Sequence, residues 1–149
     1  MRIKVAVDID APTTTVWAVL ELIESHVEWM ADAERITFLT GQRQGVGTEF
    51  ECLTRVGPLS TTDVMTVTEW EPEAAMGIKH RGVVAGRGRF TLSPLAVNRT
   101  RFRWEEELHL PLWMGGPIGE VGAKPILTRI WNANVARLRA RAEAAYLLA

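Results

Sequence analysis

Apolar and polar residues alternate over several short stretches of the chain. Ile3, Val5, Val7 and Ile9 alternate with charged or small residues, which is typical of a strand with one buried face. Further stretches of this kind, separated by glycine, proline or asparagine, predict seven strands, of which six are consecutive. The expected strands cover residues 2–9, 34–40, 48–54, 61–70, 75–80, 87–92 and 100–109. Consecutive strands pair most simply as an antiparallel meander.

Apolar residues at helical spacing predict three helices. Residues 13–23 follow Pro12, which is well suited to a first helical turn, and Ser25 should cap a second short helix. A long helix is expected from about residue 120 to residue 147, starting or bending near Pro125. Its apolar stripe consists of Leu127, Ile130, Trp131, Asn134, Leu138, Ala142 and Ala145.

The long helix is the only predicted element that can cover the whole sheet. At about 1.5 Å per residue, its 25 or so residues extend for nearly 40 Å. A twisted seven-stranded sheet needs a partner with a long apolar stripe, because its apolar face must be buried. We therefore predict an α+β fold, with a single domain of residues 1–149, in which the C-terminal helix packs on the sheet.

Charge pairs indicate how the last two strands align. Pairing that places Arg87 opposite Glu107 and Arg89 opposite Glu105 brings opposite charges together on the outer face. Each such pair stabilises a sheet by roughly 0.2–1 kcal/mol, and a one-residue slip would move the aromatic rings into water. The inner, mostly apolar face would then contain Asp63, Met65, Val67, Glu69, Met76, Ile78, His80, Phe90, Leu92, Phe102, Trp104, Glu106 and Leu108.

Two ionisable residues stand out in the middle of this inner face. The hairpin between residues 80 and 88 is expected to place His80 opposite Gly88, which itself lies opposite Glu106. His80 and Glu106 would be two strands apart, with about 9–10 Å between their backbones, so we expect no direct hydrogen bond between them, but room for water or a polar ligand group. Asp63 and Glu69 lie near strand ends, where exposure at the rim of the sheet is expected.

Composition and charge restrict the classes of function. The 149 residues are 47% hydrophobic and 23% charged, with a net charge of −1, which is ordinary for a soluble globular protein. Basic residues are interleaved with acidic ones, so a nucleic-acid partner is not expected. No apolar run approaches the roughly 20 residues of a membrane span. The single Cys52 excludes an internal disulfide and fits the cytoplasm; we expect it to be a small buried residue.

The motifs needed for a metal or cofactor are missing. His26 and His109 have no histidine, cysteine or aspartate at ligand spacing, so no metal site is predicted. Gly82, Gly86 and Gly88 lie in a hairpin and not before a helix, so they do not form a phosphate-binding loop. We expect no cofactor, and the sequence leaves the oligomeric state open.

Several local stretches carry a resemblance to a known family: residues 7–12 with 16–17, 28–30, 45–48, 69–72, 80 with 82, 86–90 and 100–106. They resemble the SRPBCC superfamily, also called START-like, and within it the polyketide cyclase/dehydrase and lipid-transport branch. The order of elements also resembles the helix-grip fold of this superfamily. The resemblance implies a curved sheet wrapped around the long helix, with an internal apolar cavity that takes lipids, steroids, polyketides or hormones. It implies no particular reaction, because carriers, receptors and enzymes share this fold.

We therefore expect the protein to bind a small hydrophobic molecule between the sheet and the C-terminal helix. His80, Glu106 and Asn134 are the candidate polar anchors, and Trp113 and Met114 are a candidate gate in the loop before that helix. Two alternatives stay open: a cyclase or dehydratase with His80 and Glu106 as acid and base, and a non-catalytic regulatory module with a solid core. The expected ligand-binding residues are Phe50, Met65, Ile78, His80, Phe90, Trp104, Glu106, Trp131 and Asn134.

Overall fold

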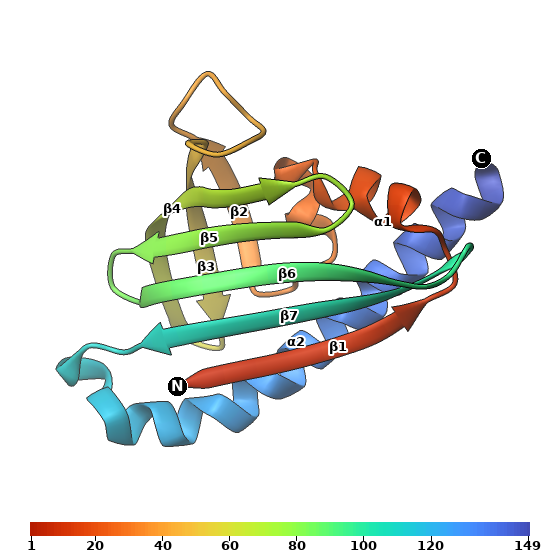
Figure 1. Cartoon of the computed structure of the whole chain (residues 1–149). Coiled ribbons are helices and arrows are strands. Elements are labelled where there is room, and N and C mark those ends of the chain that lie inside the picture. The colour runs from red at the N-terminus through yellow and green to blue at the C-terminus, as the bar shows by residue number, and fades with distance from the viewer.

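The computed structural model describes residues 1–149 and contains one seven-stranded antiparallel sheet with helices on one side (Figure 1). The strand order is β1-β7-β6-β5-β4-β3-β2, so six consecutive strands form the predicted meander and β1 joins it beside β7. The strands are β1 (Arg2–Ile9), β2 (Ala33–Phe38), β3 (Glu49–Val56), β4 (Leu59–Glu71), β5 (Ala75–Arg81), β6 (Ala85–Ala96) and β7 (Arg99–His109). The helices are α1 (Thr13–Leu20), η1 (Ile23–Glu28), η2 (Leu112–Met114) and α2 (Gly116–Leu148).

The arrangement of these elements confirms the predicted α+β fold class. The long helix α2 runs diagonally across the sheet, and α1 and η1 bridge from β1 to β2 at the opposite edge (Figure 1). The helix boundaries differ from the prediction, because α2 already begins at Gly116 and continues through Pro125. The second short helix is the 3₁₀ helix η1, and Ser25 lies inside it instead of capping it. No helix is both long and apolar enough to cross a membrane.

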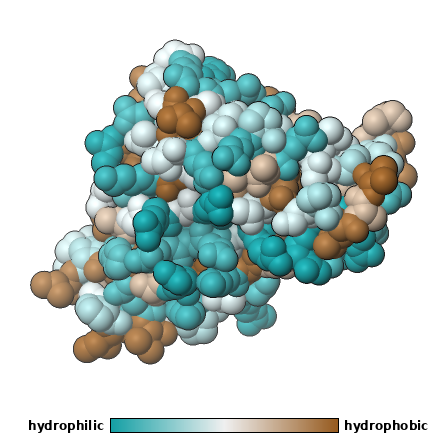
Figure 2. All heavy atoms as spheres, viewed as in Figure 1, coloured by the Kyte–Doolittle hydropathy of each residue, from teal (hydrophilic) through white to brown (hydrophobic).

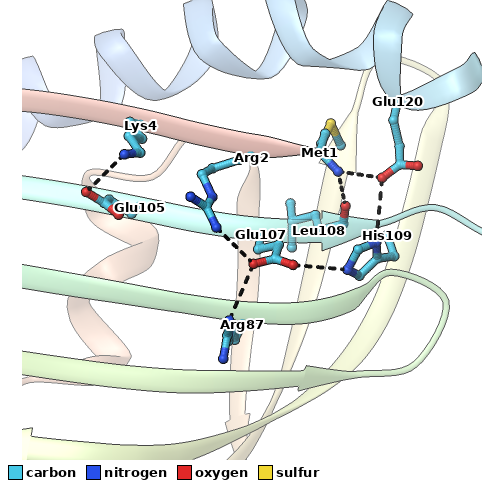
Figure 3. A network of polar contacts seen from close by, with 9 residues as sticks. All are labelled: Met1, Arg2, Lys4, Arg87, Glu105, Glu107, Leu108, His109 and Glu120. Carbon is cyan, nitrogen blue, oxygen red and sulfur yellow. Dashed lines mark hydrogen bonds and ion pairs between the residues drawn. The ribbon is translucent and has the colours of Figure 1, made fainter. Parts of the chain in front are cut away.

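The predicted alignment of β6 with β7 is confirmed. Gly88 pairs with Glu106 and Arg87 pairs with Glu107, as the charge pattern indicated. Figure 3 shows the resulting outer-face contacts, in which the Glu107 carboxylate lies 3.5 Å from Arg87 and 3.4 Å from Arg2 on β1. These side chains are exposed, so each ion pair contributes at most about 1 kcal/mol. The main effect of these ion pairs is to favour the observed pairing of β6 with β7 over pairings shifted along the strands.

The predicted alignment of β5 with β6 is wrong by two residues. His80 lies opposite Gly86 instead of Gly88, because the hairpin turn is centred one residue earlier than expected. The turn is held from outside the hairpin, since the backbone N–H of Val84 donates a hydrogen bond of 3.2 Å to Asp63 on β4. A shift of two residues leaves every side chain on its predicted face, but it changes which side chains are neighbours.

A β-bulge in β4 moves Glu69 away from the inner face. The pairing of β4 with β5 shifts between Val67 and Glu69, so the alternation of side chains reverses at that point. Glu69 lies on the outer face, where it accepts hydrogen bonds of 2.7 and 3.0 Å from the Arg89 guanidinium. Its predicted inner-face position is therefore wrong.

The buried apolar side chains form two clusters instead of one continuous core. The larger cluster joins α1, Trp29 and α2 to β1, β5, β6 and β7, and it includes Trp104 stacked on Trp131 with their ring centroids 4.3 Å apart. The smaller cluster, around Phe50 and Met65, lies on β3 and β4 next to Ile23 of η1. The space between sheet and helix is therefore incompletely filled.

Candidate functional site

A cavity of about 590 Å³ lies between the inner face of the sheet and the helices. Of its 33 lining residues, 23 are hydrophobic, and its volume is within the range of small-molecule sites in proteins. Strands β3 to β7 supply one wall, and η1, η2 and the first half of α2 supply the other. Inward positions of the strands form the wall of the sheet, as the alternation predicted: Phe50, Cys52, Asp63, Met65, Met76, Ile78, His80, Gly88, Phe90, Trp104, Glu106 and Leu108.

Small residues help to keep the cavity open. Gly119 and Ala123 line it from α2, and Gly119 also lets η2 pack closely, because a Cβ atom there would overlap the backbone carbonyl of Met114. Gly88 lines it from β6 and has no side chain of its own. A Cβ atom added to Gly88 would lie 2.8 Å from the carboxyl carbon of Glu106 on the neighbouring strand, so the Glu106 carboxylate occupies the space above Gly88.

This position brings Glu106 into direct contact with His80. The Glu106 Oε2 and His80 Nε2 atoms are 3.1 Å apart, although one strand separates them. The expectation that they are too distant for contact is therefore wrong, because Glu106 reaches across Gly88 and the β5 register places His80 diagonally opposite. The second Glu106 oxygen, Oε1, accepts a 2.9 Å hydrogen bond from the indole N–H of Trp104. Both ionisable side chains are buried, with 8% of His80 and 6% of Glu106 exposed.

Asp63 completes a buried polar cluster with His80 and Glu106. It is buried instead of exposed at the rim as predicted, and its oxygens accept hydrogen bonds from Thr61 and from the backbone of Val84. Burial alone would lower the pKa of His80, but the nearby negative charges of Glu106 and Asp63 outweigh it and raise that pKa. The cluster therefore favours a protonated His80.

The N–H of His80 Nε2 lacks a well-directed partner despite this contact. The atom is completely buried and makes no hydrogen bond of acceptable geometry to any protein group, so the approach of Glu106 is an ion pair and not an aligned hydrogen bond. Buried donors are nearly always satisfied in proteins, which makes an unpaired one at a cavity wall notable. This donor belongs to a residue that lines the cavity, next to the Glu106 carboxylate.

Asn134 does not reach the cavity, in contrast to its predicted role as an anchor. Its amide is fully buried and engaged, since it donates to Asp32 and accepts from the backbone N–H of Ala31 and from Arg137. These bonds attach α2 to the segment between η1 and β2. Asp32 also accepts a 3.0 Å bond from Trp131 and lines the cavity, which sequence reasoning missed because no local motif marks it.

His26 is a second cavity-lining histidine, and no sequence pattern indicated its position. Its Nε2 atom lies 2.7 Å from the carbonyl oxygen of Leu20, and its ring packs against Trp29 and Phe90. Burial lowers the pKa of His26 to about 4, so the ring is neutral at physiological pH. The cavity wall therefore contains one neutral histidine and one whose protonated form is favoured.

Cys52 behaves as the sequence predicted, as a small buried residue. Burial raises the pKa of its thiol to about 11, which opposes formation of a nucleophilic thiolate. No group of three or more histidine, cysteine, aspartate or glutamate side chains is arranged to hold a metal ion.

The exposed lining residues locate the mouth of the cavity. Leu59, Trp113 and Ile126 all border the cavity and are also exposed to solvent, Trp113 by 73%. The two predicted gate residues, Trp113 and Met114, are thus at the boundary between cavity and solvent. Figure 2 shows apolar groups gathered where η2 and the start of α2 lie, at the lower left of the view; Leu112 and Ile118 are among the exposed residues there.

The fold and its cavity define a START-like helix-grip protein. A START superfamily protein from Mycobacterium smegmatis is similar in structure, with 13% identity over 99% of this chain and 97% of the other, and a TM-score of 0.71. A conserved protein from Geobacillus kaustophilus has a TM-score of 0.79 at 10% identity, covering 98% and 97% of the two chains. The Zhui aromatase/cyclase from Streptomyces sp. R1128 has a TM-score of 0.75 at 16% identity, covering 96% and 93%.

A sequence model identifies the family within this class. The model for polyketide cyclase / dehydrase and lipid transport proteins matches residues 1–143, and the chain belongs to this family. The predicted SRPBCC membership is thereby confirmed. A search of curated proteins found no match.

Proposed function

We propose that the protein binds a small hydrophobic molecule in the cavity between its sheet and α2. The observation that carries the proposal is the largely apolar space of about 590 Å³, which has an unpaired buried donor, His80 Nε2, at its wall. Sites of this kind bury most of a ligand in apolar surroundings and use a few polar groups to orient it. In this proposal, His80 and Glu106 orient the ligand, and Trp113 and Met114 gate its entry.

The test measures binding of an apolar fluorescent dye, together with mass spectrometry of molecules released when the purified protein is denatured. We expect the dye to bind and to be displaced by compounds that co-purify. Ile78→Trp should reduce dye affinity at least tenfold by filling the cavity, since Ile78 lines it. Lys79→Trp is the matched control, because Lys79 is exposed on the outer face of the same strand. Failure of the dye to bind, or equal binding by folded Ile78→Trp, would refute the proposal.

A second candidate function is catalysis of a cyclisation or dehydration. The contact of 3.1 Å between His80 and Glu106 favours it, because paired acid and base groups are what these reactions require. Glu106 would remove a proton from a carbon next to a carbonyl, and His80 would deliver a proton to the departing hydroxyl. The family description, polyketide cyclase / dehydrase and lipid transport, gives a substrate class to try, the polyketides. The regulatory-module alternative expects a filled interior and is less well supported by a cavity of this size.

The catalytic candidate requires turnover that depends on both residues. His80→Gln and Glu106→Gln should each abolish turnover of a polyketide substrate while the substrate still binds. Glu105→Gln is the matched control, because Glu105 is the adjacent residue of β7 and is exposed on the outer face. Turnover that persists in both inner-face variants would rule out this reaction scheme.

A further inference from the structure

Three carboxyl groups line the cavity wall. Asp32, Asp63 and Glu106 line it, and His80 is the one basic group whose protonation the surroundings favour, since His26 has a pKa of about 4. The wall therefore combines three carboxyl groups with two imidazoles, of which only that of His80 favours the protonated form.

No lysine or arginine charge balances these carboxyl groups within the cavity. Arg89 is the only arginine along the wall, and no lysine lines it. The Arg89 guanidinium is held on the outer face by two hydrogen bonds to Glu69. Met1 also lines the cavity, but its ammonium group is paired with Glu120 and donates to the carbonyl oxygen of Leu108. An anionic ligand group would thus be buried beside carboxyl groups with no cation left to pair with it other than His80, which is unfavourable because buried charges need pairing.

The His80 and Glu106 side chains together match one type of neutral group. The N–H of His80 Nε2 has no aligned hydrogen-bond partner, and Glu106 Oε2, which accepts no aligned hydrogen bond from a protein group, is ion-paired with it at 3.1 Å. A hydroxyl can accept from the imidazole and donate to the carboxylate at the same time. A carboxylate can only accept, and an ammonium can only donate and would lie beside the imidazole.

We infer that the cavity selects neutral ligands that carry a hydroxyl group, and that it rejects carboxylates of the same shape. The inference rests on the proposed ligand-binding function and adds the chemical class of the ligand. The hydroxyl is placed between His80 and Glu106, and the apolar body extends along Phe90, Trp104 and Ile78. Free fatty acids and other organic anions are poor ligands on this account.

The experiment compares four fluorescent probes that share one apolar skeleton. Pyrene, 1-pyrenemethanol, 1-pyrenecarboxylate and 1-pyrenemethylamine are titrated into the wild-type protein at pH 7.5, where the last two are charged. We expect the alcohol to bind about tenfold more tightly than pyrene, because it gains hydrogen bonds to ionised groups. The carboxylate should bind at least tenfold more weakly than the alcohol.

A variant then links the preference to Glu106. Glu106→Gln keeps the shape of the side chain but removes its charge, so the ratio of alcohol to carboxylate affinity should fall about tenfold. In Glu105→Gln, the same change on the outer face, the ratio should not change. Circular dichroism and thermal unfolding establish whether both variants are folded. The comparison of the four probes on the wild-type protein remains a valid test even if Glu106→Gln does not fold.

The outcomes separate this inference from the function on which it rests. Equal affinity for the alcohol and the carboxylate overturns the selectivity and leaves the cavity a binding site. Tightest binding of the amine also overturns it, and identifies instead an acidic site for cations. If none of the probes binds, pyrene included, the proposed binding function fails together with the inference.

Discussion

Replacement of Gly88 by alanine tests how the polar cluster is assembled. The Cβ of the alanine would lie 2.8 Å from the carboxyl carbon and Oε1 of Glu106, and 2.9 Å from its Cγ. Non-bonded carbon atoms normally approach to about 3.5–4.0 Å, so the Glu106 side chain must move by roughly 1 Å. The backbone of Gly88 does not have a positive φ angle, which means that the strain comes from the side-chain overlap alone.

The movement of Glu106 changes two interactions. It disturbs the 2.9 Å hydrogen bond from Trp104 and lengthens the 3.1 Å approach to His80. Overpacking of this kind typically lowers the free energy of unfolding by about 1–3 kcal/mol. The pKa of His80 should also fall, because burial continues to lower it while the opposing attraction of Glu106 weakens.

Two measurements check this prediction. Urea unfolding gives the change in stability, and an NMR titration of the His80 ring protons gives its pKa directly. Gly41→Ala is the control, because no atom lies within 4 Å of the Cβ position there. A folded Gly88→Ala protein with an unchanged His80 pKa would show that Glu106 does not depend on the space above Gly88.

Three further predictions follow from other buried groups. Acidification should destabilise the protein: the unfolded chain protonates His26 near pH 6.5 and the folded chain only near 4, so about 3 kcal/mol of unfolding free energy is lost between these values. Urea unfolding at each pH should show this loss in the wild type and a smaller one in His26→Leu. Cys52, with a thiol pKa of about 11, should react with iodoacetamide at pH 8 only after unfolding; rapid labelling of the folded protein would contradict its burial. Asn134→Ala should lower the free energy of unfolding by about 2–4 kcal/mol, because it leaves the Ala31 N–H and Asp32 without their partner, while the alcohol-to-carboxylate ratio stays unchanged. A changed ratio would place Asn134 in the binding site after all.

Local patterns were sufficient for the faces of the sheet and for one register. Alternation along β6 and β7 placed Phe90, Trp104 and Glu106 on the inner face, and charge pairs aligned the two strands correctly. Both signals come from residues close together in sequence, joined by a short turn. The apolar stripe of α2 likewise identified the element that covers the sheet, although not its first residue.

Contacts between distant segments decided the remaining features of the candidate site. The hairpin from β5 to β6 is held by Asp63, which lies about 20 residues earlier, and the bulge in β4 moved Glu69 to the outer face. Asn134 has the spacing of a cavity residue, but it binds Asp32 across 102 positions of sequence.

Except beyond the bulge in β4, sequence alone thus determined which side chains face inward. It also determined which helix covers them, because hydrophobic periodicity is a local property. Only the tertiary structure decided that His80 touches Glu106. That contact depends on a turn position, a neighbouring glycine and a carboxylate from a third strand, and no local pattern encodes their combination.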